Sequence, residues 1–224
     1  TVLDIVSRAP FQRLGIAALL NGSADAEWTH GDVRTLTVTS KLGVSPATAT
    51  APGETPGSGI IDATYTQRDG AVDLRQLDLT LPTSQFAARG RFTAYPLTGP
   101  TSLAVDFHSG NLAEFDTVFR DLGLERNGKA GVAALPVNLQ GKADFRGNWT
   151  GSLASPRLKG QLQATQISLE LPQSVTSGST PHVFRWDSVE AEGSYDAQHI
   201  AIVHGQLQRG PTQILLDGSL MAAP

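Results

Sequence analysis

Residues 135–149 read LPVNLQGKADFRGNW, and this stretch decides the fold class. Every second residue from Leu135 to Trp149 is apolar or glycine, whereas the residues between them are polar, charged or proline. Successive side chains of a β-strand point to opposite faces of its sheet, so a period of two predicts one long strand, or two collinear strands. One face is then apolar and the other solvated, which is typical of antiparallel pairing because parallel sheets are normally covered on both sides.

The same alternation recurs along the rest of the chain. It is found at Leu36 and Val38, Val72 and Leu74, Phe86 to Phe92, Leu103 to Phe107, Leu158 to Ala164, Ile200 and Ile202, and Ile214 and Leu216. The 224 residues also include 23 glycines and 13 prolines, which favours short strands and many turns. We therefore predict an all-β chain with one or two short helices.

Two tandem copies of one unit are visible in the sequence. LNGSAD at residues 20–25 matches LQGKAD at residues 139–144, and each copy soon reaches Trp-Thr, at Trp28 and Trp149. FAARG at residues 86–90 and ILLDG at 214–218 close the two units. Such self-similarity predicts a repeated strand unit, in which Trp28 and Trp149 occupy equivalent sites and either cap a core at a hairpin or line a groove mouth.

We place the boundary between the units at residue 108. Unit 1 covers residues 1–108 and unit 2 covers residues 109–224. Within them we expect helices at 3–14 and 111–122, strands at 16–107 and 135–221, and Pro, Ser and Thr-rich loops at 45–59 and 172–181. The second helix has an apolar stripe at spacings of three and four, and Asn111 with Glu114 resembles a capping box.

Composition and charge argue against several function classes. The net charge is −4 and the basic residues are scattered, so the chain has no basic patch that would attract nucleic acid, and nucleic acid is not expected as a partner. The chain has no cysteine, which excludes disulfides, thiolate metal sites and thiol nucleophiles. No segment approaches the length of a membrane span, and residues 1–20 do not resemble a signal peptide, so any targeting segment is expected outside these residues.

No catalytic or metal-binding motif emerges from the sequence. His199 and His204 lie five residues apart in one predicted strand, which is expected to place them on opposite faces. Asp62, Asp73 and Asp78 are candidates for the paired carboxylates of a glycosidase, but they read more simply as residues of the polar face. We therefore predict a protein that is not an enzyme and that needs no cofactor and no metal.

Residues 137–162, VNLQGKADFRGNWTGSLASPRLKGQL, carry a resemblance to a known family. A strand, then G-x-L, then x-x-P-x-L-x-G-x-L is similar to the pattern of the AsmA-like proteins, above all the TamB group of translocation and assembly module proteins. The second helix, the strand led by L-x-G and the closing LDGSL at 216–220 also fit this pattern. These elements are loose patterns of glycine and apolar residues, and they extend over most of the chain.

The resemblance implies an open antiparallel repeat sheet, a β-taco or half-pipe with an apolar concave face that carries phospholipid tails across the periplasm. It also implies an inner-membrane anchor outside these residues and an outer-membrane β-barrel protein as a partner in membrane protein assembly. The lipid-groove candidates are Leu36, Val38, Val72, Leu74, Phe86, Val137, Leu139, Phe145, Ile200, Ile202, Ile214 and Leu216. The alternative is a closed β-sandwich binding or adhesion module, in which the same residues form a sealed core; periodicity does not distinguish the two.

Overall fold

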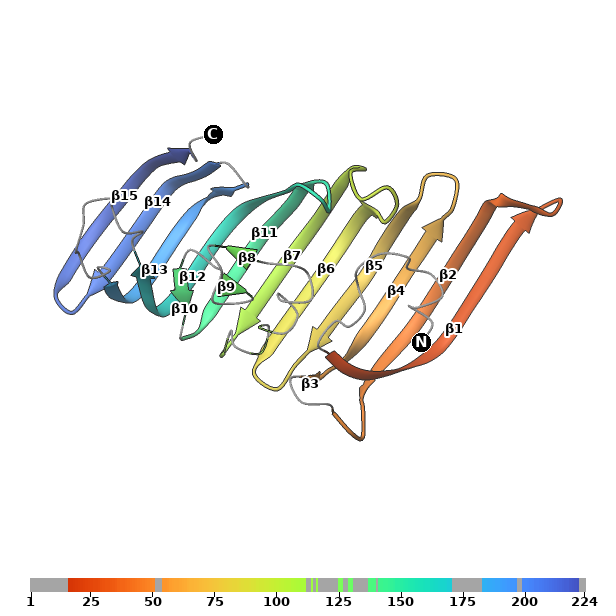
Figure 1. Ribbon diagram of the computed structural model, residues 1–224, viewed down its shortest axis with the longest axis horizontal. Helices are drawn as coiled ribbons and strands as arrows, with labels where there is room; N and C mark the ends of the chain where they lie inside the picture. The colour runs from red at the N-terminus through yellow and green to blue at the C-terminus, as the bar shows by residue number, and fades with distance from the viewer. Residues whose placement is uncertain are drawn as a thin grey trace.

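A computed structural model describes most of the chain, and its ordered elements are all β-strands (Figure 1). The described residues are 16–50, 54–111, 114, 116, 125–126, 129–130, 137–139, 141–170, 183–196 and 199–221. The strands are β1 (Ile16–Thr29), β2 (Asp32–Pro46), β3 (Thr55–Pro56), β4 (Ser58–Thr66), β5 (Ala71–Thr80), β6 (Ser84–Thr93), β7 (Thr101–Ser109), β8 (Glu125–Arg126), β9 (Lys129–Ala130), β10 (Val137–Leu139), β11 (Ala143–Gly151), β12 (Pro156–Glu170), β13 (Val183–Tyr195), β14 (His199–Arg209) and β15 (Thr212–Met221).

Thirteen of these strands form one sheet, in the order β15-β14-β13-β12-β11-β7-β6-β5-β4-β2-β1-β3, with β10 paired to β12. Neighbouring strands are antiparallel, apart from the two-residue strand β3 beside β1. Strands β15 and β1 lie at opposite ends of the row, so the sheet is open and does not close into a barrel (Figure 1). The all-β, antiparallel prediction is therefore confirmed.

The predicted long strand consists of two collinear pieces. Both β10 and β11 pair with β12, and the ladder is interrupted at Gly141 and Lys142. A Cβ at Gly141 would lie 2.2 Å from the Thr165 carbonyl oxygen, so the backbones approach too closely there for a larger residue. The break therefore falls where the sequence has a glycine on its apolar side.

The expected loops and helices need correction where they can be compared with the structure. The loop predicted at 45–59 is wrong in part, because β2 continues to Pro46 and β4 begins at Ser58. Between them Thr55–Pro56 pairs with Ile16 and Ala17 as a short edge strand, a position that tolerates proline. The helix at 3–14 and the loop at 172–181 lie outside the described residues.

The predicted capping box between Asn111 and Glu114 is not formed on the Glu114 side. Only residues 111, 114 and 116 of the helix predicted at 111–122 are described. The Asn111 N–H donates to the Ser109 hydroxyl at 3.2 Å, while the Glu114 carboxylate accepts the Thr83 N–H at 2.8 Å. Glu114 therefore ties the segment after β7 to the turn before β6 and does not accept the Asn111 N–H.

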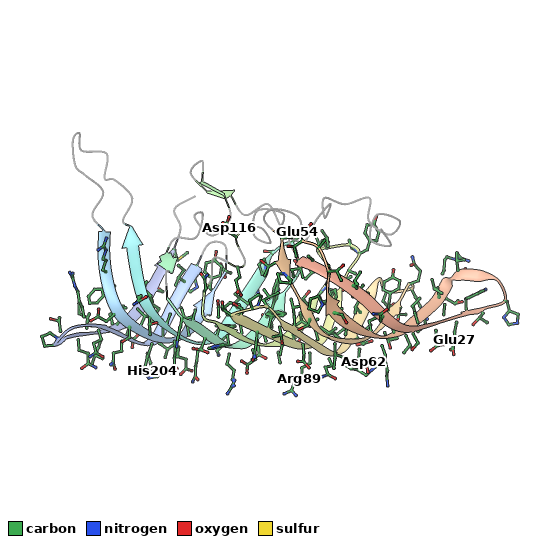
Figure 2. All side chains as sticks on the ribbon, turned by 90° about the horizontal axis from the view of Figure 1, so that it is seen from below. Glu27, Glu54, Asp62, Arg89, Asp116 and His204 are labelled. Atoms are coloured by element: carbon green, nitrogen blue, oxygen red, sulfur yellow. The ribbon has the colours of Figure 1, made fainter. Side chains whose placement is uncertain are left out.

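The cross-strand register sorts the side chains onto two faces. Directly opposed residues point to the same side of a sheet, so the pairs Leu79–Phe86, Phe86–Phe107 and Phe107–Phe145 mark what we call the apolar face. The other side, the polar face, carries cross-strand ion pairs, among them Arg146–Asp106 at 2.8 Å. Figure 2 shows Asp62, Arg89 and His204 on one side of the sheet and Glu54 and Asp116 on the other.

The β1–β2 hairpin ends in charged residues. His30 and Gly31 both have positive φ angles, of 51° and 74°, as a two-residue type I′ turn requires. Beside the turn, the Arg34 guanidinium and then its backbone N–H hold the pKa of Asp32 below its usual value. The turn residues and the contact between Asp32 and Arg34 thus stabilise the hairpin locally, at the solvent-exposed end of the sheet.

The middle of the apolar face contains a packed cluster. Its buried members are Ala63, Leu74, Ala88, Leu103 and Val105. Half-buried neighbours packed against it include Phe86, Phe92, Phe145 and Trp149. All of these side chains come from β4 to β7 and β11, so the cluster is built by neighbours within one sheet.

Leu74→Ala is expected to lower the free energy of unfolding by about 2 kcal/mol, because it removes buried apolar volume from this cluster. Leu74 is 7% exposed, whereas Ile60 of β4 lies on the polar face and is 50% exposed. Ile60→Ala is therefore the matched control, with an expected loss below about 0.5 kcal/mol. Urea denaturation of the two variants measures the difference, and equal losses would contradict the cluster.

The later strands of the two units pair in the same pattern. In unit 1 the register of β5 shifts between Leu74 and Leu77, opposite Gly90 and Ala88 of β6. In unit 2 the register of β14 shifts between Ile202 and Gly205, opposite Gly218 and Leu216 of β15. The closing glycines Gly90 and Gly218 also share a positive φ, at 136° and 151°. The matched segments 72–92 and 200–220 thus repeat a bulged three-dimensional arrangement.

The first strands of the two units do not match as the sequence motifs suggest. Strand β2 opposes Val38 to Ala26, while its counterpart β12 opposes Leu158 to Trp149. Trp149 therefore corresponds to Ala26 and not to Trp28, which is 56% exposed beside the hairpin turn. The predicted equivalence of the two tryptophans is wrong, because strand pairing and not motif spacing sets the register.

Candidate apolar binding face

The predicted groove residues gather on one face of the sheet. By cross-strand register and strand alternation, the side chains on the apolar face are Leu36, Val38, Val72, Leu74, Phe86, Phe145, Ile200, Ile202, Ile214 and Leu216. Val137 and Leu139 belong to β10, opposite Leu169 and Ile167 of β12, and their side chains lie outside the described set. The sheet thus brings together residues separated by up to 180 positions in the chain.

Further residues of this face follow from the same alternation. Among them are Leu42, Ile61, Leu77, Leu79, Phe92, Leu103, Val105, Phe107, Trp149, Leu162, Val189 and Leu207. Two apolar residues two positions apart mark a strand face, and extending that spacing to the end of each strand recovers most of this set.

Exposure of the apolar face rises toward the ends of the row of strands. Leu103 and Val105 in the middle are 8% and 6% exposed. Ile214 and Leu216 of β15 reach 38% and 36%, and Leu20 of β1 reaches 56%. Large apolar side chains are thus offered to solvent at both ends, where an apolar ligand would gain most by covering them.

The apolar face is dominated by uncharged side chains. A charged residue that the register assigns to it is Arg209, which lies at the hairpin end of β14 opposite Thr212, two positions beyond the pair Leu207–Ile214. Its hydroxyls include Ser84 and Ser109, which are buried and bonded to each other at 2.8 Å, and Tyr65, which lies 2.8 Å from Gln67 Oε1. Binding on this face is therefore governed by apolar contact.

The carboxylates predicted as a possible glycosidase pair are held by different partners in the described part of the chain. The three aspartates considered for glycoside hydrolysis are each engaged separately: Asp62 with Arg75, Asp73 with Arg91 and Asp78 with Gln76. No three His, Asp, Glu or Cys side chains among the described residues lie close enough together to hold a metal ion. The charged residues of the polar face read as a solvated surface.

The expectation that His199 and His204 lie on opposite faces is wrong. The bulge at Val203 shifts the alternation, so His204 opposes Glu192 while Ile202 opposes Gly193. Both histidines consequently fall on the polar face, but five residues of strand still separate them by about 16 Å. His204 lies 3.8 Å from Glu192, and His108 is paired with Asp144.

Comparison with known proteins gives no information on the function of this chain. In the described residues, no helix is long and apolar enough to cross a membrane. No known protein-family model matches the chain, and neither a curated protein nor a solved structure is significantly similar to it.

Proposed function

We propose that this chain is a segment of a periplasmic bridge that conducts phospholipid acyl chains along the apolar face of its sheet. The observation that carries the proposal is a continuous apolar face across successive strands. Eleven strands from β15 to β1 span about 48 Å at the usual spacing between paired strands, which is longer than a phospholipid tail.

The energetics of apolar burial support this proposal. Each methylene that leaves water contributes about 0.8 kcal/mol, so a tail lying along the face offsets much of the cost of leaving a bilayer. An apolar face lets the tail move from strand to strand without breaking a specific contact. We expect low selectivity among acyl chains and no dependence on a headgroup contact within this face.

The shape of the sheet also supports a half-pipe or β-taco. The long strands at the blue end of the chain bend away from the side that carries His204, toward the side of Glu54 and Asp116 (Figure 2). Such bending would make the apolar face the concave one. A closed β-sandwich, the alternative architecture, needs a second sheet, and the described residues outside the large sheet form only the two-residue pair β8–β9.

The cellular setting belongs to the same proposal. A tail-conducting sheet needs membranes at both ends, which suits a periplasmic protein with an inner-membrane anchor and an outer-membrane β-barrel partner, as the resemblance to the TamB group implies. The proposal includes neither an enzyme activity nor a cofactor, and it assigns no role to nucleic acid.

The test is whether the purified chain carries phospholipid. We expect native mass spectrometry to show protein with bound phospholipid, and expect the delipidated protein to take up a fluorescent phosphatidylethanolamine from vesicles of phosphatidylethanolamine and phosphatidylglycerol. A heat-unfolded sample is the control for nonspecific carry-over. Bare protein in the spectrum, together with no uptake from vesicles, would overturn the proposal.

A further inference from the structure

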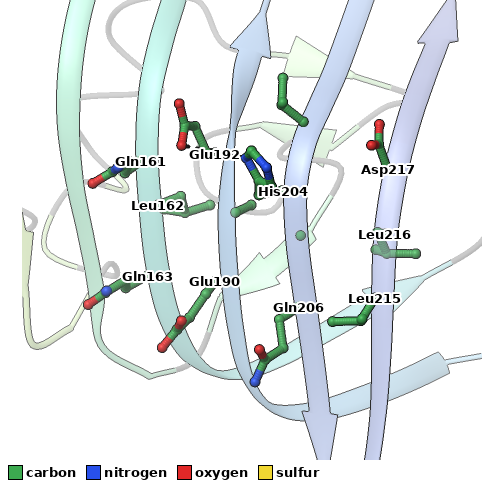
Figure 3. A pocket seen from close by; sticks show the side chains of 13 residues that line it. Gln161, Leu162, Gln163, Glu190, Glu192, His204, Gln206, Leu215, Leu216 and Asp217 are labelled. Atoms are coloured by element: carbon green, nitrogen blue, oxygen red, sulfur yellow. Dashed lines mark ion pairs between the residues drawn. The ribbon is translucent and has the colours of Figure 1, made fainter.

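We propose that a hollow on the polar face of unit 2 binds the arginine side chain of a partner polypeptide. The hollow has a volume of about 500 Å³ and lies across β12 to β15 (Figure 3). Its lining includes the carboxylates Glu190, Glu192 and Asp217 and the amides Gln161, Gln163 and Gln206. Neither lysine nor arginine is among its described lining residues.

The corresponding place in unit 1 shows how this fold holds a guanidinium group. Strand pairing makes Asp62 the counterpart of Glu192, since Asp62 opposes Gln76 as Glu192 opposes His204 across the same bulge. There Arg75 Nε donates to Asp62 Oδ1 at 2.7 Å and Arg75 Nη1 donates to the Thr64 hydroxyl at 2.8 Å. The Asp62 side chain is only 19% exposed as a result of this packing.

Unit 2 keeps the acid and lacks the guanidinium. The residue in the place of Arg75 is Val203, which precedes His204 in the bulge as Arg75 precedes Gln76. The Glu192 side chain is 48% exposed, and its ion-pair partner is His204 at 3.8 Å, drawn as a dashed line in Figure 3. A guanidinium supplied from outside would restore the contact that unit 1 makes internally.

The residues around Glu192 in unit 2 are also less basic than those around Asp62 in unit 1. Lys41 lies 3.9 Å from Asp62, and its counterpart by register is Gln161, which opposes Glu192. Arg89 of unit 1 corresponds to Asp217, because each precedes the closing glycine of its unit. Every basic position of the unit 1 site is therefore neutral or acidic in unit 2, which favours a cationic ligand by charge complementarity.

Apolar neighbours point to a polypeptide as the source of the cation. Leu215 and Val203 line the hollow and are 75% and 51% exposed. An arginine packs its methylene stem against such side chains while its planar group pairs with a carboxylate in two parallel hydrogen bonds. The fitting partner is thus a segment with an arginine next to apolar residues. This proposal concerns the face opposite the lipid proposal and does not depend on it.

The test compares two tripeptide amides, Ac-Leu-Arg-Leu-NH2 and its citrulline analogue, by titration into the ¹⁵N-labelled chain. We expect saturable shifts at the amides of Glu192, His204 and Asp217 with the arginine peptide, and none with the neutral analogue. Affinity should fall about threefold for each carboxylate removed in Glu192→Gln and Asp217→Asn, and fall again as salt is raised. Asp62→Asn, at the equivalent site of unit 1, should leave it unchanged.

Val203→Arg is the second variant, since it rebuilds the arrangement of Arg75 within the chain. It should abolish binding of the arginine peptide while the protein keeps its circular dichroism spectrum. Equal binding of the citrulline peptide, an undiminished affinity in Val203→Arg, or an equal loss in Asp62→Asn would each overturn the proposal. Free L-arginine binding as tightly as the peptide would overturn the assignment to a polypeptide.

Discussion

Leu216→Asp is expected to reduce phospholipid uptake at least about tenfold while leaving the sheet folded. Leu216 lies on the apolar face and is 36% exposed, so the sheet accommodates a polar replacement better there than in its buried middle. A bound acyl chain crossing β15 would have to desolvate the new carboxylate, which costs more than the 1.4 kcal/mol that corresponds to a tenfold change.

The neighbouring residue provides the matched control. Leu215 is 75% exposed and, by strand alternation, points to the polar face opposite Gln206. Leu215→Asp introduces the same charge in the same strand but away from the proposed lipid path, so uptake should be unchanged. Fluorescent lipid uptake is measured for both variants after circular dichroism confirms their folding. Equal uptake by two folded variants would remove β15 from the path.

The assignment of residues to faces could be predicted from the sequence, because alternation is a local property of a strand. Pairs such as Val72 and Leu74, or Ile214 and Leu216, reveal their face without reference to any partner strand. All ten groove candidates with described side chains consequently lie on one face. Whether a second sheet covers that face is not a local property; in the described residues the strand order shows one large sheet and the two-residue pair β8–β9.

The bulges could not be predicted, since they arise from the pairing of strands. Val203 adds a residue to β14 two positions before Gly205, and the shift carries His204 to the same face as His199. The acidic hollow lies beside this bulge, so sequence reasoning missed it as well. One available signal was the exchange of Arg75, Lys41 and Arg89 for uncharged or acidic residues in unit 2. The counterparts of these three residues can be identified only once the strand register is known.

In the first strand of each unit, a clear sequence motif does not give the strand pairing. LNGSAD and LQGKAD share Leu, Gly, Ala and Asp at the same spacing, yet the strand partners are offset by four positions relative to the motif. The break at Gly141 separates β10 from β11 in unit 2, while the corresponding motif in unit 1 lies inside the uninterrupted β1. The shared motif therefore predicts a repeat as a pattern, but it does not give the register.

Gly160→Val is expected to lower the free energy of unfolding by at least about 3 kcal/mol. Gly160 of β12 directly opposes Gly147 of β11, and this pair lies in the ladder that joins the later strands of unit 2 to β7. A Cβ at Gly160 would lie 2.3 Å from the Arg146 carbonyl oxygen and 2.6 Å from the Gly147 Cα. Both obstacles are backbone atoms, so the strands themselves must separate to relieve the clash.

Gly43→Val of β2 is the control for the cost of adding a side chain to a strand glycine. The nearest atom to a Cβ at Gly43 is the Asn21 carbonyl oxygen at 3.6 Å, which is an ordinary contact. Val also has a high strand propensity, so this change should cost less than about 0.5 kcal/mol. Urea denaturation of both variants compares the two sites. Similar midpoints and slopes would mean that β11 and β12 are not held as closely as the pairing of Gly147 with Gly160 requires.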